Sequence, residues 1–241
     1  MVICSIKKTR RDARRQWTER EIVNAIFYLV KTGIQWDMLP NDFPPKSTVF
    51  YHFQKWNYDG TWEKVLQLLN RRIRIKEGRK PEPTLGIIDS KSVQAANKCE
   101  EKGIDGGKKI KGRKRHIVTD ILGCLLHIKV HKANEHDTIA GGRVALETLD
   151  RYPSIKAFCA DAGYRKTCKE VIEQILGKIC EISERITDTW AVLPKRWIVE
   201  RTFGWQNLFR RLSKDYEFST CSAENMVRVS MIQLMLDRLC R

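Results

Sequence analysis

Three acidic residues stand where rigid elements would present a carboxylate. Asp89 ends the apolar run Leu-Gly-Ile-Ile, Asp161 ends the run Ala-Phe-Cys-Ala, and Glu200 lies in the helical stretch Trp-Ile-Val-Glu-Arg-Thr-Phe. A carboxylate at the end of a buried strand is held firmly enough for metal binding or acid–base work, although an aspartate there also favours capping the next turn. Carboxylate oxygens are ligands of Mg²⁺ and Mn²⁺, and two such ions promote phosphodiester displacement. The three acids together predict a metal site for that chemistry.

Glu200 adds weight to this interpretation because of its helical neighbours. Trp197 and Phe203 lie one turn away on either side, so we expect Glu200 to share a core-facing stripe with them. An unpaired charge in a core is costly, so the carboxylate needs a partner. A bound cation or an ion pair with Arg196 or Arg201 would satisfy it, and the sequence leaves both open.

The net charge of the chain indicates a polyanionic partner. Among 241 residues, 45 are Lys or Arg and 29 are Asp or Glu, which gives a formal charge of +16. Lysines and arginines that neutralise phosphates release condensed counterions, so nucleic acid is the first partner to consider. An anionic membrane surface is the competing interpretation. The longest uncharged stretch, residues 22–30, is far short of the roughly 20 apolar residues that span a bilayer.

The densest group of cations lies in residues 107–116, which we expect to form a loop before a strand. Glycines in this stretch would let the backbone approach DNA phosphates closely. A solvated loop without a DNA role is the alternative. The cations concerned are Lys108, Lys109, Lys111, Arg113, Lys114 and Arg115.

The chain divides by pattern at residues 77–84, which are charged and contain two prolines. Residues 1–76 are predicted to be helical, with Thr18 and Glu21 forming a capping box and Gly33 ending the first helix. Two more helices follow, so this part is either a helix-turn-helix-like module for DNA binding or dimerisation, or a plain three-helix unit.

Residues 85–241 alternate between short apolar strands and helical stretches, which predicts a mixed α/β sheet with flanking helices. We expect strands at 85–88, 116–119, 124–130, 155–160 and 178–182. Helices are expected at 137–149, at 166–176, after Pro194 and at 222–239.

The remaining metal-ligand types favour structural roles. Asp120 begins Asp-Ile-Leu-Gly, which is typical of a hairpin turn, although Asp120 is also the best rival metal ligand. A zinc site made from His116, His127 and His131 is disfavoured, and His136 with Asp137 is expected to begin a helix. The eight cysteines form no Cys-x-x-Cys pair, so we interpret them as reduced thiols of a cytosolic protein.

Several of these stretches together resemble a known family. Ile-Ile-Asp-Ser, Cys-Ala-Asp-Ala-Gly-Tyr-Arg and Trp-Ile-Val-Glu-Arg-Thr-Phe-Gly-Trp are similar to the three acidic motifs of DDE transposases from bacterial insertion sequences, in the branch named for insertion sequence five. The resemblance runs from about Trp17 to Tyr216. It implies a ribonuclease H-like fold with Asp89, Asp161 and Glu200 as catalytic residues that bind Mg²⁺ or Mn²⁺, as two ions. The implied activity is cleavage at the ends of an insertion sequence and strand transfer into target DNA.

The resemblance also implies partners and a place in the cell. The partners would be element ends with terminal inverted repeats and target DNA, bound by a homodimer in the cytoplasm at the nucleoid, without a membrane. The chain looks shortened at its N-terminus beside the family pattern. A non-catalytic DNA-binding regulator, or an inactive transposase remnant, is the alternative function.

The last motif departs from the family pattern at two positions. Arg196 matches, but Leu193 stands where the family has Tyr and Asn207 where it has Lys. We therefore expect Arg210 or Lys214 to supply the missing cation for a DNA phosphate.

Overall fold

The computed structural model describes residues 17–96, 98–183 and 196–241. Its N-terminal part consists of helices that follow the predicted pattern. Thr18 caps the first helix, its hydroxyl accepts from the backbone of Glu21 and the Glu21 carboxylate accepts from the backbone of Thr18, so the predicted capping box is confirmed. Gly33 ends that helix with a φ of 75°, a left-handed conformation that glycine adopts readily. The helical elements are α1 (Glu19–Thr32), the short η2 (Trp36–Met38), α2 (Lys46–Tyr58) and α3 (Thr61–Lys76).

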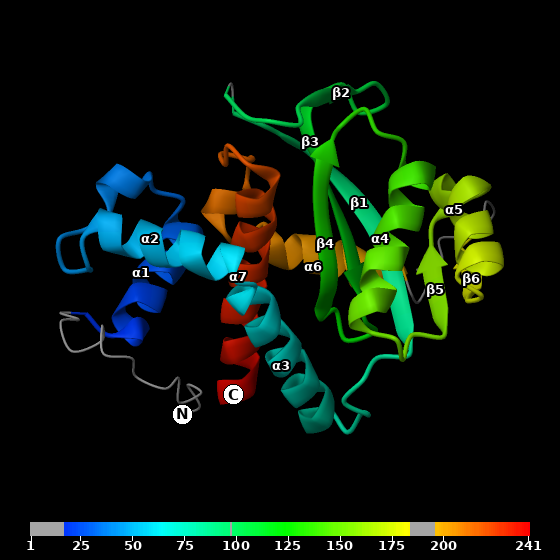
Figure 1. The fold of residues 1–241 in the computed structure, drawn as a ribbon, viewed down its shortest axis with the longest axis horizontal. Coiled ribbons are helices and arrows are strands. Elements are labelled where there is room, and N and C mark those ends of the chain that lie inside the picture. The colour runs from blue at the N-terminus through cyan, green and yellow to red at the C-terminus, as the bar shows by residue number, and fades with distance from the viewer. Residues whose placement is uncertain (1–16, 97, 184–195) are drawn as a thin grey trace.

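A mixed sheet fills the middle of the molecule (Figure 1). β1 pairs antiparallel with β3 and parallel with β5, β5 pairs parallel with β6, and β2 and β4 both pair antiparallel with β3. The predicted mixed α/β class is thus confirmed. The strands are β1 (Leu85–Gln94), β2 (Gly103–Asp105), β3 (Ile110–Thr119), β4 (Leu125–Lys132), β5 (Ala157–Ala160) and β6 (Ile179–Ile182).

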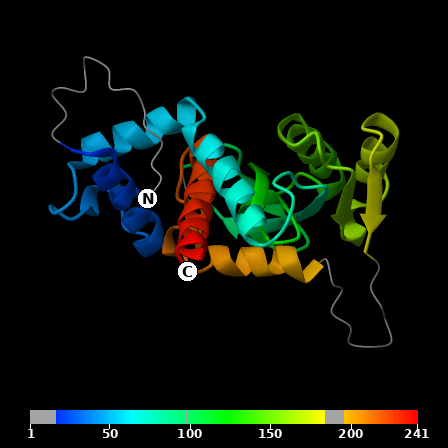
Figure 2. The same ribbon diagram turned by 90° about the horizontal axis from the view of Figure 1, so that it is seen from below.

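Helices cover both faces of the sheet. α4 and α5 pack on one face and α6 and α7 on the other, where α3 also contacts β4 (Figures 1 and 2). The stretch expected as one helix at 166–176 is a short α-helix followed by a π-helical turn. The remaining elements are α4 (Asp137–Arg151), η3 (Ala162–Tyr164), α5 (Thr167–Glu170), η4 (Val171–Ile175), α6 (Arg196–Gln206), η5 (Arg210–Leu212) and α7 (Thr220–Cys240).

Successive residues along each central strand belong to opposite cores. Ile87 packs in the core under α6 and α7, whereas Ile88 packs in the core under α4. Ile117 and Val118 on β3 divide in the same way. This period of two is what a strand buried on both faces requires, and it fixes which side chains of β1 can reach which helix.

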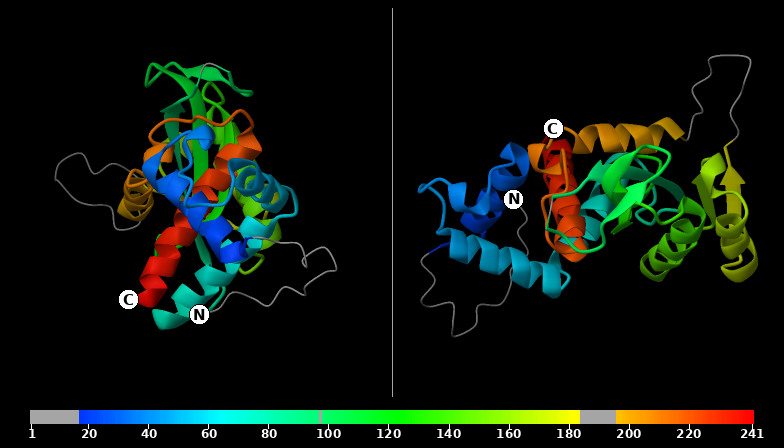
Figure 3. Two further views of the ribbon diagram at one scale, coloured as in Figure 1. Left: turned by 90° about the vertical axis from the view of Figure 1, so that its left-hand side faces the viewer. Right: turned by 90° about the horizontal axis from the view of Figure 1, so that it is seen from above.

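The last helix joins the two parts of the chain. α7 lies between the N-terminal helices and the sheet, and it packs against α1, α2, α3 and β4 (Figures 2 and 3). Met226, Met231 and Met235 are buried in a core shared by both parts. These methionines therefore pack inside the molecule. None of the helices in the described ranges is long and apolar enough to cross a membrane.

Candidate active site

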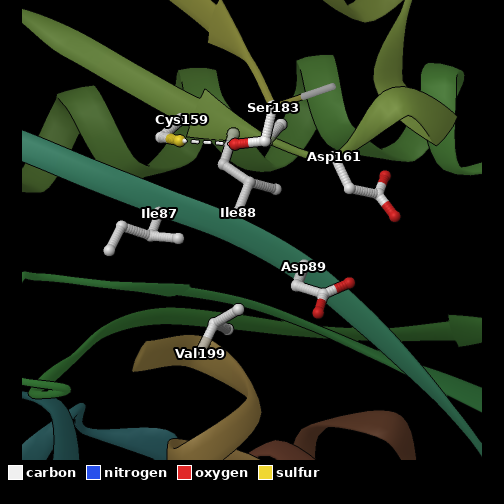
Figure 4. Close-up of a pocket in the computed structure, with 8 residues that line it drawn as sticks. Ile87, Ile88, Asp89, Cys159, Asp161, Ser183 and Val199 are labelled. Carbon is white, nitrogen blue, oxygen red and sulfur yellow. Dashed lines mark hydrogen bonds between the residues drawn. The ribbon is translucent and has the colours of Figure 1, made fainter. Parts of the chain in front are cut away.

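Asp89 and Asp161 come from neighbouring parallel strands. β1 and β5 pair with Ile87 opposite Cys159, so continuing the register by two residues sets Asp89 opposite Asp161. Adjacent strands lie about 4.8 Å apart. Both aspartates line one small cavity, and Figure 4 shows their carboxylates at the same end of the group of lining residues. Asp89 and Asp161 therefore lie at the same end of two adjacent strands, and their role as site residues stays a prediction.

Local hydrogen bonds orient both carboxylates. The backbone N–H of Ser90 donates to Asp89 Oδ1 at 2.7 Å. The N–H of Gly163 donates to Asp161 Oδ1 at 2.8 Å, which caps the turn η3. The turn-capping interpretation of Asp161 is therefore correct, but one oxygen suffices for it. A carboxylate has two oxygens and about four lone-pair sites, so accepting one hydrogen bond does not by itself prevent metal binding.

Glu200 lies on α6, which packs on the face of β1 that carries Asp89. Its neighbour Val199 lines the same cavity as the two aspartates. The prediction that Glu200 is core-facing is wrong, because Ile198, Val199 and Phe203 form the buried stripe while Glu200 is exposed. Trp197, which was expected to face the core together with Glu200 and Phe203, is 40% exposed as well. Of the two aromatic residues one turn from Glu200, only Phe203 is buried.

The oxygen donors suit a hard divalent cation, but they are not yet assembled around one point. Carboxylates from adjacent strands are the donors that Mg²⁺ and Mn²⁺ take. Within the described ranges, however, no group of three or more His, Cys, Asp or Glu side chains is close enough to hold a metal ion. The chemistry of the two aspartates fits a metal ion. Glu200 follows the cavity-lining Val199 in the sequence, but its carboxylate does not form a three-ligand group with the two aspartates.

A buried polar chain lies behind the aspartates on the opposite face of β1. The Tyr164 hydroxyl is 2.8 Å from His116 Nε2, and His116 Nδ1 is 3.2 Å from His131 Nε2. Burial lowers the pKa of His116 to about 3, with the neighbouring His131 as the next cause, so the imidazole is neutral. Burial, followed by the charge of Asp89, raises the pKa of Tyr164, so its hydroxyl keeps its proton.

These buried polar side chains lie close in sequence to both aspartates. Tyr164 ends the turn that Asp161 caps, and Ser90 follows Asp89 and donates from Oγ to Asp137 Oδ1 at 2.9 Å. Sequence reasoning assigned no role to Tyr164 or Ser90. Spacing gave a signal for Ser90, since a residue next to a strand-end aspartate points to the opposite face and must find polar partners there.

The basic run is not the loop that was expected. β3 begins at Ile110, and Arg113, Lys114 and Arg115 are buried on it. Arg113 Nε donates to the carbonyl of Glu100 at 2.8 Å, Lys114 Nζ donates to Asp137 at 3.0 Å, and Arg115 Nη1 donates to the carbonyl of Leu212 at 2.7 Å. Their prediction as DNA-backbone contacts is therefore wrong for these side chains, because internal acceptors already hold their cationic groups.

Other predicted cations do reach the surface. Lys108, Lys109 and Lys111 are exposed around the β2–β3 turn, and Arg210 and Lys214 are exposed beyond α6. Leu193 and the side chain of Arg196 lie outside the described residues. Arg201 stacks between Trp197 and Trp205, with its guanidinium carbon 4.3 and 4.6 Å from their ring centroids.

Asp120 and the histidines have the structural roles that the sequence favoured. Asp120 Oδ1 accepts from the backbone of Leu122 and Cys124, each at 2.9 Å, and Oδ2 pairs with Arg74, so the turn interpretation is correct. His136 caps the start of α4, as expected. The cysteines in the described ranges are all free thiols.

Comparison with known proteins places these features in a family. Residues 3–66 match the family described as a putative transposase of the IS4/5 family, and residues 80–234 match the family described as a transposase DDE domain. No curated protein matches. Among solved structures, a chain of the crystal structure of the Mos1 strand transfer complex aligns with 10% identity over 98% of this chain and 79% of its own, at a TM-score of 0.36.

The structural likeness is too weak to argue from, but the second family match covers well over half of the chain and includes all three predicted acids. The strand order and the antiparallel and parallel pairings around β1 agree with the ribonuclease H-like architecture that the resemblance implied. The chain therefore belongs to the family of the transposase DDE domain, and its residues 3–66 are in addition similar to putative IS4/5 family transposases.

Proposed function

We propose that this protein cleaves DNA at the ends of an insertion sequence and transfers the strand to target DNA, with Asp89, Asp161 and Glu200 as the catalytic acids. The observation that carries the proposal is the register of β1 and β5, which sets two carboxylates side by side within the DDE-matched region. Bound Mg²⁺ or Mn²⁺, as a pair of ions, would supply activation of the attacking oxygen and stabilisation of the leaving oxygen.

The residues of the chain would position the reacting strand for two successive displacements. In the first, water attacks the phosphodiester at the element end, a new P–O bond forms and the bond to the 3′ oxygen breaks. In the second, the freed 3′ hydroxyl attacks a target phosphodiester in line, so that a new P–O bond forms while the bond from that phosphorus to the 3′ oxygen of the target strand breaks and releases a target 3′ hydroxyl. Backbone hydrogen bonds would orient Asp89 and Asp161 for this chemistry, and Glu200 on α6 would be the third acid.

Exposed cations would hold the DNA around this centre. The exposed cations are Lys108, Lys109, Lys111, Arg210 and Lys214, and they supply sequence-independent affinity for phosphates. Arg196, whose side chain lies outside the described residues, would join them because it matches the family pattern of the last motif. Residues 1–76 would bind the terminal inverted repeats or a second copy, residues 77–84 would connect, and residues 85–241 would carry the chemistry. We propose a homodimer on DNA, acting in the cytoplasm at the nucleoid.

A nicking assay tests the proposal. The full chain is incubated with supercoiled plasmid that carries the sequences flanking its reading frame, in Mg²⁺, Mn²⁺ or Ca²⁺. We expect nicking by the parent and loss of more than about 100-fold in Asp161→Asn, because disturbing even a residue that orients a metal ligand costs 10–100-fold. Asp150→Asn, on the exposed face of α4, is the matched control and should nick as the parent does.

The second candidate, a non-catalytic DNA-binding regulator, is favoured by one observation. The acids in the described ranges form no three-ligand group. If the parent cuts no end-bearing DNA in any of the three ions, while Asp161→Asn binds that DNA as the parent does, the regulator is the correct function.

A further inference from the structure

Lys91 lies beside the candidate active site and has no part in the scheme above. It follows Asp89 by two residues on β1, so both side chains are on the face that α6 covers. The distance between these positions along a strand is about 6.6 Å. Lys91 Nζ donates to Asn207 Oδ1 at 2.8 Å, just beyond the end of α6, and lies 6.0 Å from the ring centroid of Phe203.

The surroundings of Lys91 are electrostatically unfavourable for an ammonium. Its cross-strand partner on β3 is Arg115, and like charges directly opposite each other destabilise a sheet. The hydrogen-bond acceptor at its tip is a neutral amide, which offsets a full charge less well than an anion does.

Arg115 adds an unused donor at the same place in the sheet. Its Nη1 and Nη2 donate to the carbonyls of Leu212 and Lys214, at 2.7 and 3.1 Å. Its Nε is buried and has no hydrogen-bond partner. A buried N–H without an acceptor is costly, so the two carbonyl partners of Arg115 leave one donor of its guanidinium unsatisfied.

We propose that Lys91 binds a phosphodiester oxygen of the DNA strand whose reacting bond lies at Asp89 and Asp161. The ligand is a phosphate of the nucleic-acid backbone next to the reacting one. An anion bound at Lys91 offsets the repulsion between Lys91 and Arg115, whose own guanidinium stays buried against backbone carbonyls. Asn207 keeps the ammonium pointed toward the end of α6 until the strand arrives. This inference rests on the proposed function, because it takes the aspartates to mark the reacting bond.

Salt-dependent binding tests the contact directly. A fluorescent duplex carrying the flanking end sequence is titrated with full-length protein in Ca²⁺ over a range of KCl concentrations. Each phosphate contact contributes about 0.9 to the slope of log K against log[salt]. We expect Lys91→Gln to reduce the slope by about that amount and Lys91→Arg to keep it. Lys169→Gln, which removes the same charge from an exposed lysine near Glu173 on α5, should leave the slope unchanged.

Asn207→Ala separates a phosphate contact from a purely structural hydrogen bond, because it removes the acceptor and keeps the ammonium. We expect it to retain the parent salt slope. If Lys91→Gln and Asn207→Ala lower the midpoint of urea unfolding equally and both keep the parent slope, the proposal is overturned.

The cleavage assay distinguishes this failure from failure of the proposed function. Nicking by the parent, lost in Asp161→Asn, together with an unchanged slope in Lys91→Gln, refutes the Lys91 contact alone. A reduced slope in Lys91→Gln, with no nicking by the parent, refutes the cleavage function and retains the phosphate contact.

Discussion

His116 is a residue whose neutrality is imposed by the fold. It is fully buried between Tyr164 and His131, and its charged form has no water to solvate it. In the unfolded chain a histidine titrates near pH 6.5. Because the folded pKa is lower than the unfolded pKa, protons bind more tightly to the unfolded chain, and stability is lost as the pH falls below about 6.5.

We therefore expect the free energy of unfolding to fall between pH 7.5 and pH 5.5, with His116 contributing about 1.4 kcal/mol of that loss. Burial also lowers the pKa values of His127 and His131, which adds to the same trend. Urea unfolding at the two pH values measures it. His116→Asn, which does not titrate, should show a smaller pH dependence whatever its stability at pH 7.5. An equal dependence in parent and variant would contradict the assignment.

At the scale of elements, some boundaries were predictable and others were not. α1 was predictable because Thr18, Glu21 and Gly33 act within a few residues of one another. The start of β3 was not, because Arg113 and Arg115 look like a solvated run until their acceptors appear about a hundred residues later in the chain. Local pattern carries capping and alternation, but it does not carry the tertiary partners that allow a cation to be buried.

The candidate site divides in the same way. The ends of β1 and β5 could be read from apolar runs, and parallel pairing brought Asp89 and Asp161 together. The exposure of Glu200 could not be predicted, because the rotation of α6 on the sheet depends on which residues pack beneath it. Lys91 was missed for a related reason, since its nearest hydrogen-bond partner is Asn207, 116 residues away.

A buried ion pair between Asp120 and Arg74 connects the β3–β4 turn to α3. Substituting either partner therefore measures how much the packing of these two elements contributes to stability. Asp120→Ala leaves the guanidinium buried without its partner, so we expect a loss of about 3–5 kcal/mol in the free energy of unfolding. The double variant Asp120→Ala with Arg74→Met should recover part of this loss, because it leaves no uncompensated charge. Thermal or urea unfolding measures both; equal stability of parent and Asp120→Ala would contradict the structural role.

At the scale of the whole molecule, one core spans both parts of the chain. Residues of α1, α2 and α3 share it with the sheet and with α7, so residues 77–84 mark a change in sequence pattern without separating two cores. The positive charge is likewise divided. Arg113 and Arg115 are used to fix loops inside the fold, and Lys108, Lys109 and Lys111 remain available at the surface.

A protease site inserted after the exposed Gly78 tests the shared core. We expect the two fragments to remain associated after cleavage, because α7 keeps α3 in contact with the sheet side. Gel filtration in 0.5 M NaCl, where surface ion pairs are screened, should give a single peak with the elution volume of the uncut protein. Two separate folded fragments would show instead that residues 1–76 are an independent domain.

The position of α7 in the sequence also determines when the core can form during synthesis of the chain. Its buried residues extend to Met235, so the core around α1, α2 and α3 stays open until α7 has been translated. Folding of the N-terminal helices is then coupled to the synthesis of α7, although domains commonly fold from the N-terminus first as they emerge. A premature stop before α7 would leave apolar surface on both parts of the chain. We expect the product of such an interrupted gene to be degraded or to aggregate, so that it would not persist to compete for the DNA ends bound by intact copies.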